Sequence, residues 1–163
     1  MYIIPCFVLA VSIQERPGYK RQSVEHQVAF DAKMLATDTP LLHNQDIVFD
    51  TVQINVGGAY NKHHGVFIAP VSGVYHFTAT IMSVTNVVLH CSISVNGQDK
   101  ARLFGYDPAT SDQATQSLTI SLNKGDDVSV RAIDAGSTVL RGQLYSSFSG
   151  FLLYELGTAI AQL

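Results

Sequence analysis

Cysteine, tryptophan and charged residues are scarce in this 163-residue chain, which has two cysteines, no tryptophan and 14% charged residues. Cys6 and Cys91 stand in contexts too different to suggest a disulfide framework or a thiolate metal site. The ten Lys and Arg residues are scattered, and the formal net charge is -3, so no basic stripe could follow a phosphate backbone. We therefore expect no disulfide scaffold and no nucleic-acid partner.

Long apolar runs and Gly-X-Y repeats are also missing, so we expect no membrane span and no collagen stalk on this chain. The segment Met1–Ile13 is apolar apart from Ser12, and a polar, turn-like stretch follows at Gln14–Gly18. This contrast indicates a signal peptide or leader within residues 1–20, and hence a secreted protein. An N-terminal strand stays open as the alternative, because Pro5 interrupts the apolar run and no basic residue precedes it.

Helical periodicity is nearly absent from Val28 onward, and period-two alternation takes its place. Hydrophobic residues make up 47% of the chain, which is enough for the core of one domain. The sequence therefore predicts an all-β fold built from many short strands. The clearest alternating segments are Val28–Met34, Tyr75–Ile81, Val87–Val95, Leu118–Leu122 and Phe148–Glu155.

Turn residues separate the predicted strands. Asn96-Gly97 tolerates the positive φ angles of a two-residue hairpin loop, so Gln98–Phe104 is predicted to return antiparallel to Val87–Val95. The segment Asn123–Asp126 is predicted to close a second hairpin, into Val128–Ala132.

A spaced set of aromatic residues and glycines carries a family resemblance. The stretch from Phe49 to Phe77 resembles the C1q domain signature, although Ala79 stands where the signature prefers one further aromatic residue. The closing stretch Ser147–Tyr154 also looks like the last strand of that family. The matching positions are Phe49, Asn55, Tyr60, Phe67, Gly73, Tyr75 and Phe77, followed by Phe148, Gly150 and Phe151 in the closing stretch.

This resemblance implies a ten-stranded antiparallel jelly-roll sandwich of the C1q and tumour-necrosis-factor type, which assembles as a homotrimer. The C1q domain is expected at residues 26–156, followed by a short tail at residues 157–163. Tyr106 and Phe151 are candidates for the surface that a trimer covers.

Catalytic chemistry finds no support in the sequence. No Ser stands in a nucleophile-elbow context and no pair of carboxylates forms a recognisable catalytic motif, so we expect no enzyme. Cys91 lies on the apolar side of its strand, where a thiol behaves as a small hydrophobe. His63-His64 is read as a solvated loop, because adjacent residues of an extended chain point to opposite faces. His76 and His90, on the polar side of their strands, could approach each other, but two ligands alone make a weak metal site.

One loop contains oxygen ligands of the kind that calcium prefers. Asp107 and Asp112, together with backbone carbonyls, could supply such ligands. Asp112-Gln113 also resembles the Asp-Gln step that calcium-binding members of the family use near the trimer apex. Calcium is therefore the one cofactor considered, and a plain turn with solvated acids is the alternative.

The expected function is that of a secreted, non-catalytic binding protein. The resemblance implies innate-immune pattern recognition, in which a trimeric head binds microbial surface glycans, lipopolysaccharide or other repeating ligands through avidity. A cytokine-like or synaptic-organiser-like ligand of a host receptor is the alternative, and an extracellular matrix component is a third. The ligand-binding residues are not predicted, because the signature identifies a fold and not a ligand. Tyr60 and Tyr145 are the candidates for rings that stack against a sugar, although Tyr60 belongs to the signature and is expected in the core.

Overall fold

The computed structural model describes residues 26–134 and 138–157. The predicted leader at residues 1–20, Cys6 and all but the first residue of the predicted tail lie outside the described residues. None of the described residues belongs to a helix that could cross a membrane.

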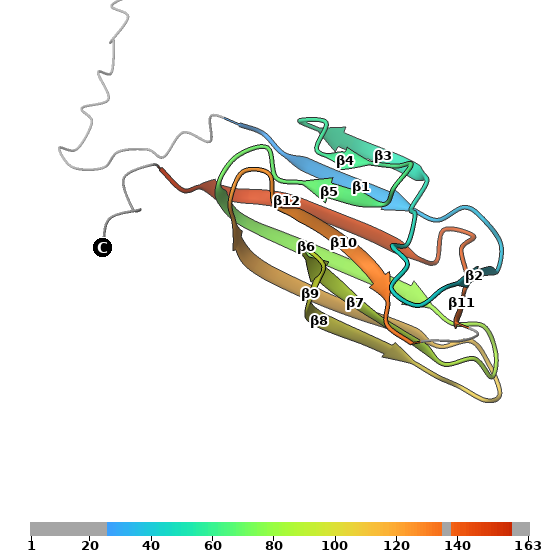
Figure 1. The fold of residues 1–163 in the computed structure, drawn as a ribbon. Coiled ribbons are helices and arrows are strands. Elements are labelled where there is room, and N and C mark those ends of the chain that lie inside the picture. The colour runs from blue at the N-terminus through green and yellow to red at the C-terminus, as the bar shows by residue number, and fades with distance from the viewer. Residues whose placement is uncertain (1–25, 135–137, 158–163) are drawn as a thin grey trace, which may run out of the picture.

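Antiparallel strands form two five-stranded sheets that pack face to face as a sandwich (Figure 1). The first sheet has the order β3-β1-β12-β6-β9, and the second has the order β4-β5-β10-β7-β8. A separate two-stranded sheet pairs β11 with β2 at one end of the sandwich. The strands are β1 (Ala29–Lys33), β2 (Thr39–Leu41), β3 (Thr51–Val56), β4 (Tyr60–Asn61), β5 (Val66–Ile68), β6 (Gly73–Met82), β7 (Leu89–Val95), β8 (Gln98–Gly105), β9 (Gln113–Leu122), β10 (Asp127–Ala132), β11 (Thr138–Leu140) and β12 (Ser147–Glu155).

This architecture confirms the predicted all-β jelly-roll, since the two large sheets together hold ten strands. Period-two alternation places every second residue in the core between the sheets. In β6, for example, Tyr75, Phe77 and Ala79 are fully buried while the residues between them are partly exposed. The strand from Val28 to Met34 follows the same rule.

The Asn96-Gly97 hairpin is confirmed. Both residues have positive φ angles, 50° and 74°, and Val95 pairs with Gln98 directly across the turn. A two-residue loop with two positive φ angles matches the right-handed twist of the strands on either side of it.

The second predicted hairpin is wrong. The turn itself exists, because the Asp126 amide donates to the Asn123 carbonyl at 3.0 Å. However, β9 pairs with β6 in the first sheet, whereas β10 pairs with β5 and β7 in the second. Both strands face the same core from opposite sides, so their alternation identifies the buried face without identifying the sheet.

The outer side of β7 is more buried than its alternation predicts. Ser92 and Ser94 point away from the core, yet both are buried. The neighbours of Ser92 across the sheet are Arg102 on β8 and Arg131 on β10, whose long side chains flank it.

The two ends of the sandwich differ. The first and last described residues lie at one end, and the loops around residues 34–38, 83–88, 106–112 and 141–146 gather at the other (Figure 1). We call this second group the apical loops.

Candidate functional site

Most of the signature residues form an aromatic core and do not face solvent. The rings of Phe30 and Tyr60 stack at 4.7 Å, and those of Phe67 and Phe77 meet edge to face at 5.1 Å. Tyr60 donates its hydroxyl to the Phe49 carbonyl at 3.1 Å, and burial raises the pKa of this phenol far above its usual value. These residues therefore hold the two sheets together and are not available to a ligand.

Asn55 and Gly73 have local structural roles. The Asn55 side-chain amide donates to the Tyr60 carbonyl at 2.9 Å, and its oxygen accepts the Tyr60 amide at 3.1 Å, which closes the β3–β4 turn. A Cβ on Gly73 would lie 2.6 Å from the Leu152 side chain, so a residue with a side chain does not fit at this position at the start of β6. Sequence reasoning placed both residues in the signature, and the structure supplies the physical reason.

Phe151 differs from the rest of the signature because its ring is on the outer face of the first sheet, with 44% of the residue exposed. It pairs with Ala29 on β1 and with His76 on β6, and Ala29 in turn pairs with Val56 on β3. The His76 and Phe151 rings lie 5.5 Å apart. An exposed apolar strip thus covers the β3–β1–β12 side of this face; its large exposed members are Ile54, Val56, Phe151, Leu153 and Tyr154.

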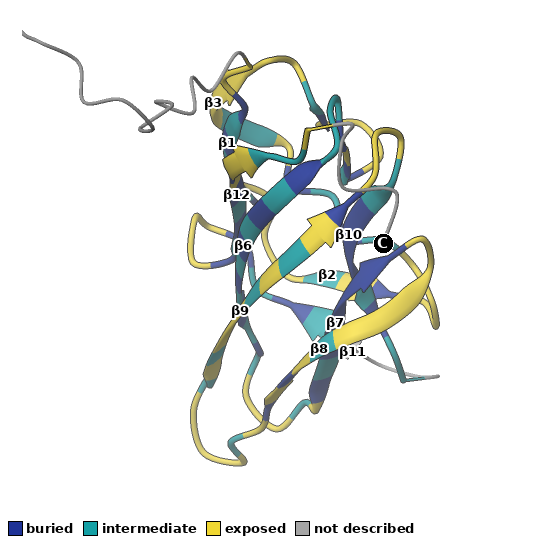
Figure 2. Cartoon of the chain, turned by 90° about the vertical axis from the view of Figure 1, so that its left-hand side faces the viewer, coloured by how far each residue is buried: buried dark blue, intermediate teal, exposed yellow. Residues whose placement is uncertain are grey.

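Hydroxyl groups occupy the other half of the same face, along β6 and β9. Three pairs of side chains bridge these strands: Thr80 with Thr115 at 2.9 Å, Thr78 with Ser117 at 3.0 Å, and His76 with Thr119 at 2.9 Å. Figure 2 shows that β9 is exposed along much of its length. The face is therefore apolar on one side and hydroxyl-rich on the other.

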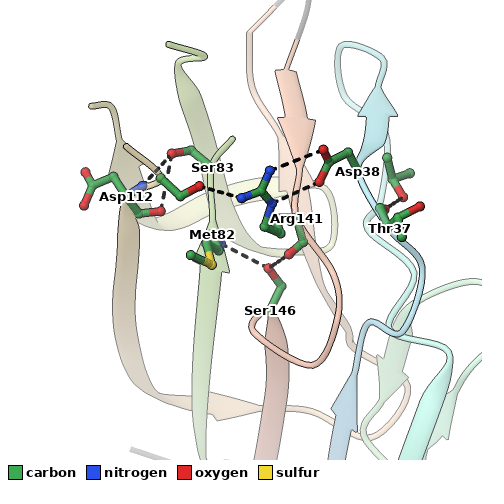
Figure 3. Close-up of polar contacts among 9 residues, drawn as sticks. Thr37, Asp38, Met82, Ser83, Asp112, Arg141 and Ser146 are labelled. Carbon is green, nitrogen blue, oxygen red and sulfur yellow. Dashed lines mark hydrogen bonds and ion pairs between the residues drawn. The ribbon is translucent and has the colours of Figure 1, made fainter. Parts of the chain in front are cut away.

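At the apical loops, one arginine joins three segments (Figure 3). The Arg141 guanidinium donates to both carboxylate oxygens of Asp38, at 3.1 and 3.4 Å, and to the Ser111 hydroxyl at 2.8 Å. The Ser146 hydroxyl donates to the Arg141 carbonyl at 2.6 Å and accepts the Met82 amide at 3.0 Å. These bonds fix the relative positions of loops that are distant in the sequence.

The predicted calcium ligands lie in the same group of loops, and their oxygens already accept hydrogen bonds. Asp107 accepts the Ala109 and Thr110 amides at 2.7 and 3.0 Å, and these bonds, in that order, lower its pKa. Asp112 accepts the amides of Tyr106 at 3.0 Å and Gln113 at 2.8 Å. Among residues 26–134 and 138–157, no three His, Cys, Asp or Glu side chains gather as a metal site. Calcium binding at this loop stays a prediction.

The histidines and the described cysteine do not form a reactive centre. The prediction that His76 and His90 could approach each other is wrong, because β6 and β7 belong to opposite sheets. His63 and His64 lie in an exposed loop. Burial raises the pKa of the Cys91 thiol to about 12, so this sulfur stays protonated and unreactive at neutral pH.

One exposed aromatic residue was missed by sequence reasoning. Phe104 lies on β8 between the buried residues Leu103 and Gly105, and 61% of it is exposed. The alternation of this strand could have identified it, because Leu103 is the apolar residue that the pattern sends inward. Tyr60 is buried in the core and Tyr145 is 52% exposed in an apical loop.

Comparison with known proteins places the fold in one family. The model of the C1q domain matches residues 29–153. The chain is 36% identical over 135 residues to human complement C1q tumor necrosis factor-related protein 3, covering 80% of this chain and 53% of that protein. It is 30% identical over 131 residues to the heavy metal-binding protein HIP of Mytilus edulis, covering 79% of this chain and 62% of that protein. The chain thus spans about half the length of the first of these relatives.

Solved structures agree on the fold. The globular domain of zebrafish complement 1qA superimposes with a TM-score of 0.66 at 22% identity, covering 80% of this chain and all of that chain. The Eiger TNF of S. frugiperda superimposes with a TM-score of 0.68 at 11% identity, covering 85% of this chain and all of that chain. At these identities the likeness concerns the fold alone.

Proposed function

This chain belongs to the C1q domain family, and from that membership we propose that it is a secreted, non-catalytic binding protein of innate immunity. In this proposal the chain forms a homotrimer whose C1q heads bind microbial surface glycans, lipopolysaccharide or other repeating ligands through avidity. The observation that carries the proposal is the family match over residues 29–153, which covers all of the sandwich except the last two residues of β12.

Exposed apolar surface supports the trimer. The strip of Ile54, Val56, Phe151, Leu153 and Tyr154 is a contiguous apolar area on one sheet face, and such areas commonly mark contact surfaces. Tyr106 is 43% exposed in the apical loop that follows β8, away from the strip on β3 and β12. A three-fold ring needs two different surfaces on each chain, because each subunit meets its neighbours head to tail.

The binding proposal is tested with the purified full chain, after sedimentation equilibrium has established its mass. Bacterial cells, lipopolysaccharide and peptidoglycan are the probes, and bovine serum albumin is the negative control. Saturable binding to at least one of these probes is expected. A well-formed trimer that binds none of them above the albumin background would contradict the proposal.

A ligand of a host receptor is the second candidate. It is favoured by the likeness to proteins named complement C1q tumor necrosis factor-related protein 3 and 2, at 36% and 34% identity. The two candidates differ in their ligands, since a receptor ligand is expected to bind one protein with nanomolar affinity and no glycan. An extracellular matrix component is the third candidate, which a pull-down with matrix material tests.

We also propose that Asp107, Asp112 and Gln113 bind calcium at the apical loops. Carboxylate and carbonyl oxygens suit calcium, and neighbouring subunits of a trimer could add further ligands. The test is sedimentation equilibrium and thermal unfolding in calcium and then in chelator. A higher Tm in calcium that the Asp112→Asn variant abolishes would support the site, and identical curves would remove it.

A further inference from the structure

The outer face of the second sheet has one strongly exposed aromatic ring. Phe104 has the largest exposed fraction, 61%, of any described Phe or Tyr. It is the only exposed large apolar side chain on the fully described strands β7, β8 and β10, and the exposed residues Val88 and Tyr106 lie one residue beyond the ends of β7 and β8. These three side chains make a smaller group than the apolar centre of a usual protein interface.

The position of the ring is held by its neighbour across the sheet. Phe104 pairs with His90 on β7, and the two rings meet edge to face with centroids 5.8 Å apart. The Nδ1 atom of His90 lies 3.2 Å from the Asp134 carboxylate, which fixes the imidazole. The largely exposed Phe104 ring therefore lies beside a constrained histidine.

Side chains that donate and accept hydrogen bonds lie on the same face as the ring. Arg102 is two residues before Phe104, about 7 Å along the strand, and 64% of its side chain is exposed. Its guanidinium lies 3.4 Å from Asp99, whose carboxylate accepts the Ser92 hydroxyl at 2.6 Å. These bonds, with that of Ser92 as the largest cause, lower the pKa of Asp99 and keep it an acceptor at neutral pH. The carboxylate is thus held in place, while most of the guanidinium remains free to donate.

The charges on this face nearly cancel. Lys100, Arg102 and Arg131 supply three positive charges, and Asp46, Asp99, Asp127 and Asp134 supply four negative charges. Arg131 is paired with Asp46 at 3.1 Å, and Arg102 with Asp99 at 3.4 Å. A face with so small a net charge has little attraction for a polyanion or a polycation, so charge complementarity favours a neutral ligand.

We propose that this face, defined by Phe104, His90, Asp99 and Arg102, is a subsite for a neutral pyranose sugar. A pyranose has an apolar face of C–H groups, which stacks on the open side of Phe104 and removes both surfaces from water. Its rim of hydroxyls meets the Asp99 acceptor and the Arg102 donors. A single exposed ring gives a weak site, so useful affinity requires the three copies that a trimer presents.

The inference rests on the proposed function, since it names the sugar class and the surface that this function uses. The apolar strip that the proposed assembly covers lies on the first sheet, whereas Phe104 lies on the second. Tyr145, which is also exposed, lies in an apical loop outside this face.

The experiment uses the full-length trimer and four free sugars: glucose, galactose, mannose and N-acetylglucosamine. Saturation-transfer NMR is expected to show transfer to the C–H protons of one sugar face in at least one case. The Phe104→Ala variant is expected to show no such transfer. Its apparent affinity for beads coated with that sugar is expected to fall at least tenfold. Phe104→Trp should retain both. Tyr145→Ala is the matched control, since it removes another exposed ring and should change neither signal.

The outcomes separate this inference from the proposed function. If the wild-type trimer binds bacterial surfaces and Phe104→Ala binds them equally well, only the sugar subsite is wrong. If wild type binds heparin but none of the four neutral sugars, the subsite is also wrong. If wild type binds no microbial surface and no sugar, both proposals fail. Sedimentation equilibrium and the Tm of each variant verify that assembly and folding are unchanged.

Discussion

At the scale of single residues, Gly150 lies at the centre of β12 against two rings of the core. A Cβ at this position would lie 2.4 Å from the Phe77 ring and 2.9 Å from the Phe30 ring. Gly150→Ala is therefore expected to destabilise the fold by about 1–3 kcal/mol, the usual cost of overpacking. Urea unfolding followed by fluorescence measures this free energy. Gly157→Ala is the control, because a Cβ on Gly157 meets nothing within 4 Å, and equal losses in both variants would contradict the argument.

Asp126 supplies a prediction about pH. Its pKa is lowered first by the Asn96 side-chain amide, at 2.9 Å, and then by the Asn123 backbone amide, at 2.7 Å. A carboxyl whose folded pKa is below its unfolded value of about 3.9 stabilises the fold above that pH. This contribution is lost as the pH falls through the lowered folded value.

The measurement compares the Tm of wild type and of Asp126→Asn at several pH values. Wild type is expected to have the higher Tm at pH 7, and the difference should shrink steadily below about pH 4. A difference that is the same at pH 7 and in strong acid would show that the carboxylate charge has no part in holding this turn.

At the scale of elements, Arg141 joins the segment before β2 to the loop before β9. A planar guanidinium can bond Asp38 and Ser111 together, whereas a lysine ammonium cannot reproduce this geometry. Arg141→Lys and Arg141→Ala are both expected to speed amide hydrogen exchange around residues 37–41 and 106–112, with the β6 core unchanged. The Tm of the whole domain should change little, because the pair is partly exposed. Unchanged exchange in both loops would refute this role.

At the scale of the whole molecule, Phe151 separates folding from assembly. Its ring faces outward, so Phe151→Asp should leave the sandwich folded and place a charge inside the proposed trimer contact. Sedimentation equilibrium is expected to show a monomer for this variant and a trimer for wild type. Phe104→Ala, which removes an even more exposed ring from the other sheet, should remain a trimer. A trimeric Phe151→Asp variant would place the contact elsewhere.

Local patterns account for the parts of the structure that sequence reasoning predicted. Alternation follows from the geometry of an extended chain, and Asn96-Gly97 forms a hairpin because both residues accept positive φ angles. The spaced aromatic residues identify the family because they fill one shared core. The alternation and the turn residues each lie within a few residues of the structure that they predict.

Contacts between distant segments were decided only by the tertiary structure. The alternation of β9 and β10 shows which side of each strand is buried, but both strands face one core, so their separation into two sheets is not visible in it. The alternation of β8 places Phe104 outward, but the residues that lie beside its ring on the neighbouring strand are known only from the pairing of β7 with β8. The sequence by itself therefore determined the family and seven of the twelve described strands with their buried faces, namely β1, β6 to β10 and β12. The tertiary structure decided which sheet each strand joins and which side chains share an open face, because these depend on contacts between residues far apart in the chain.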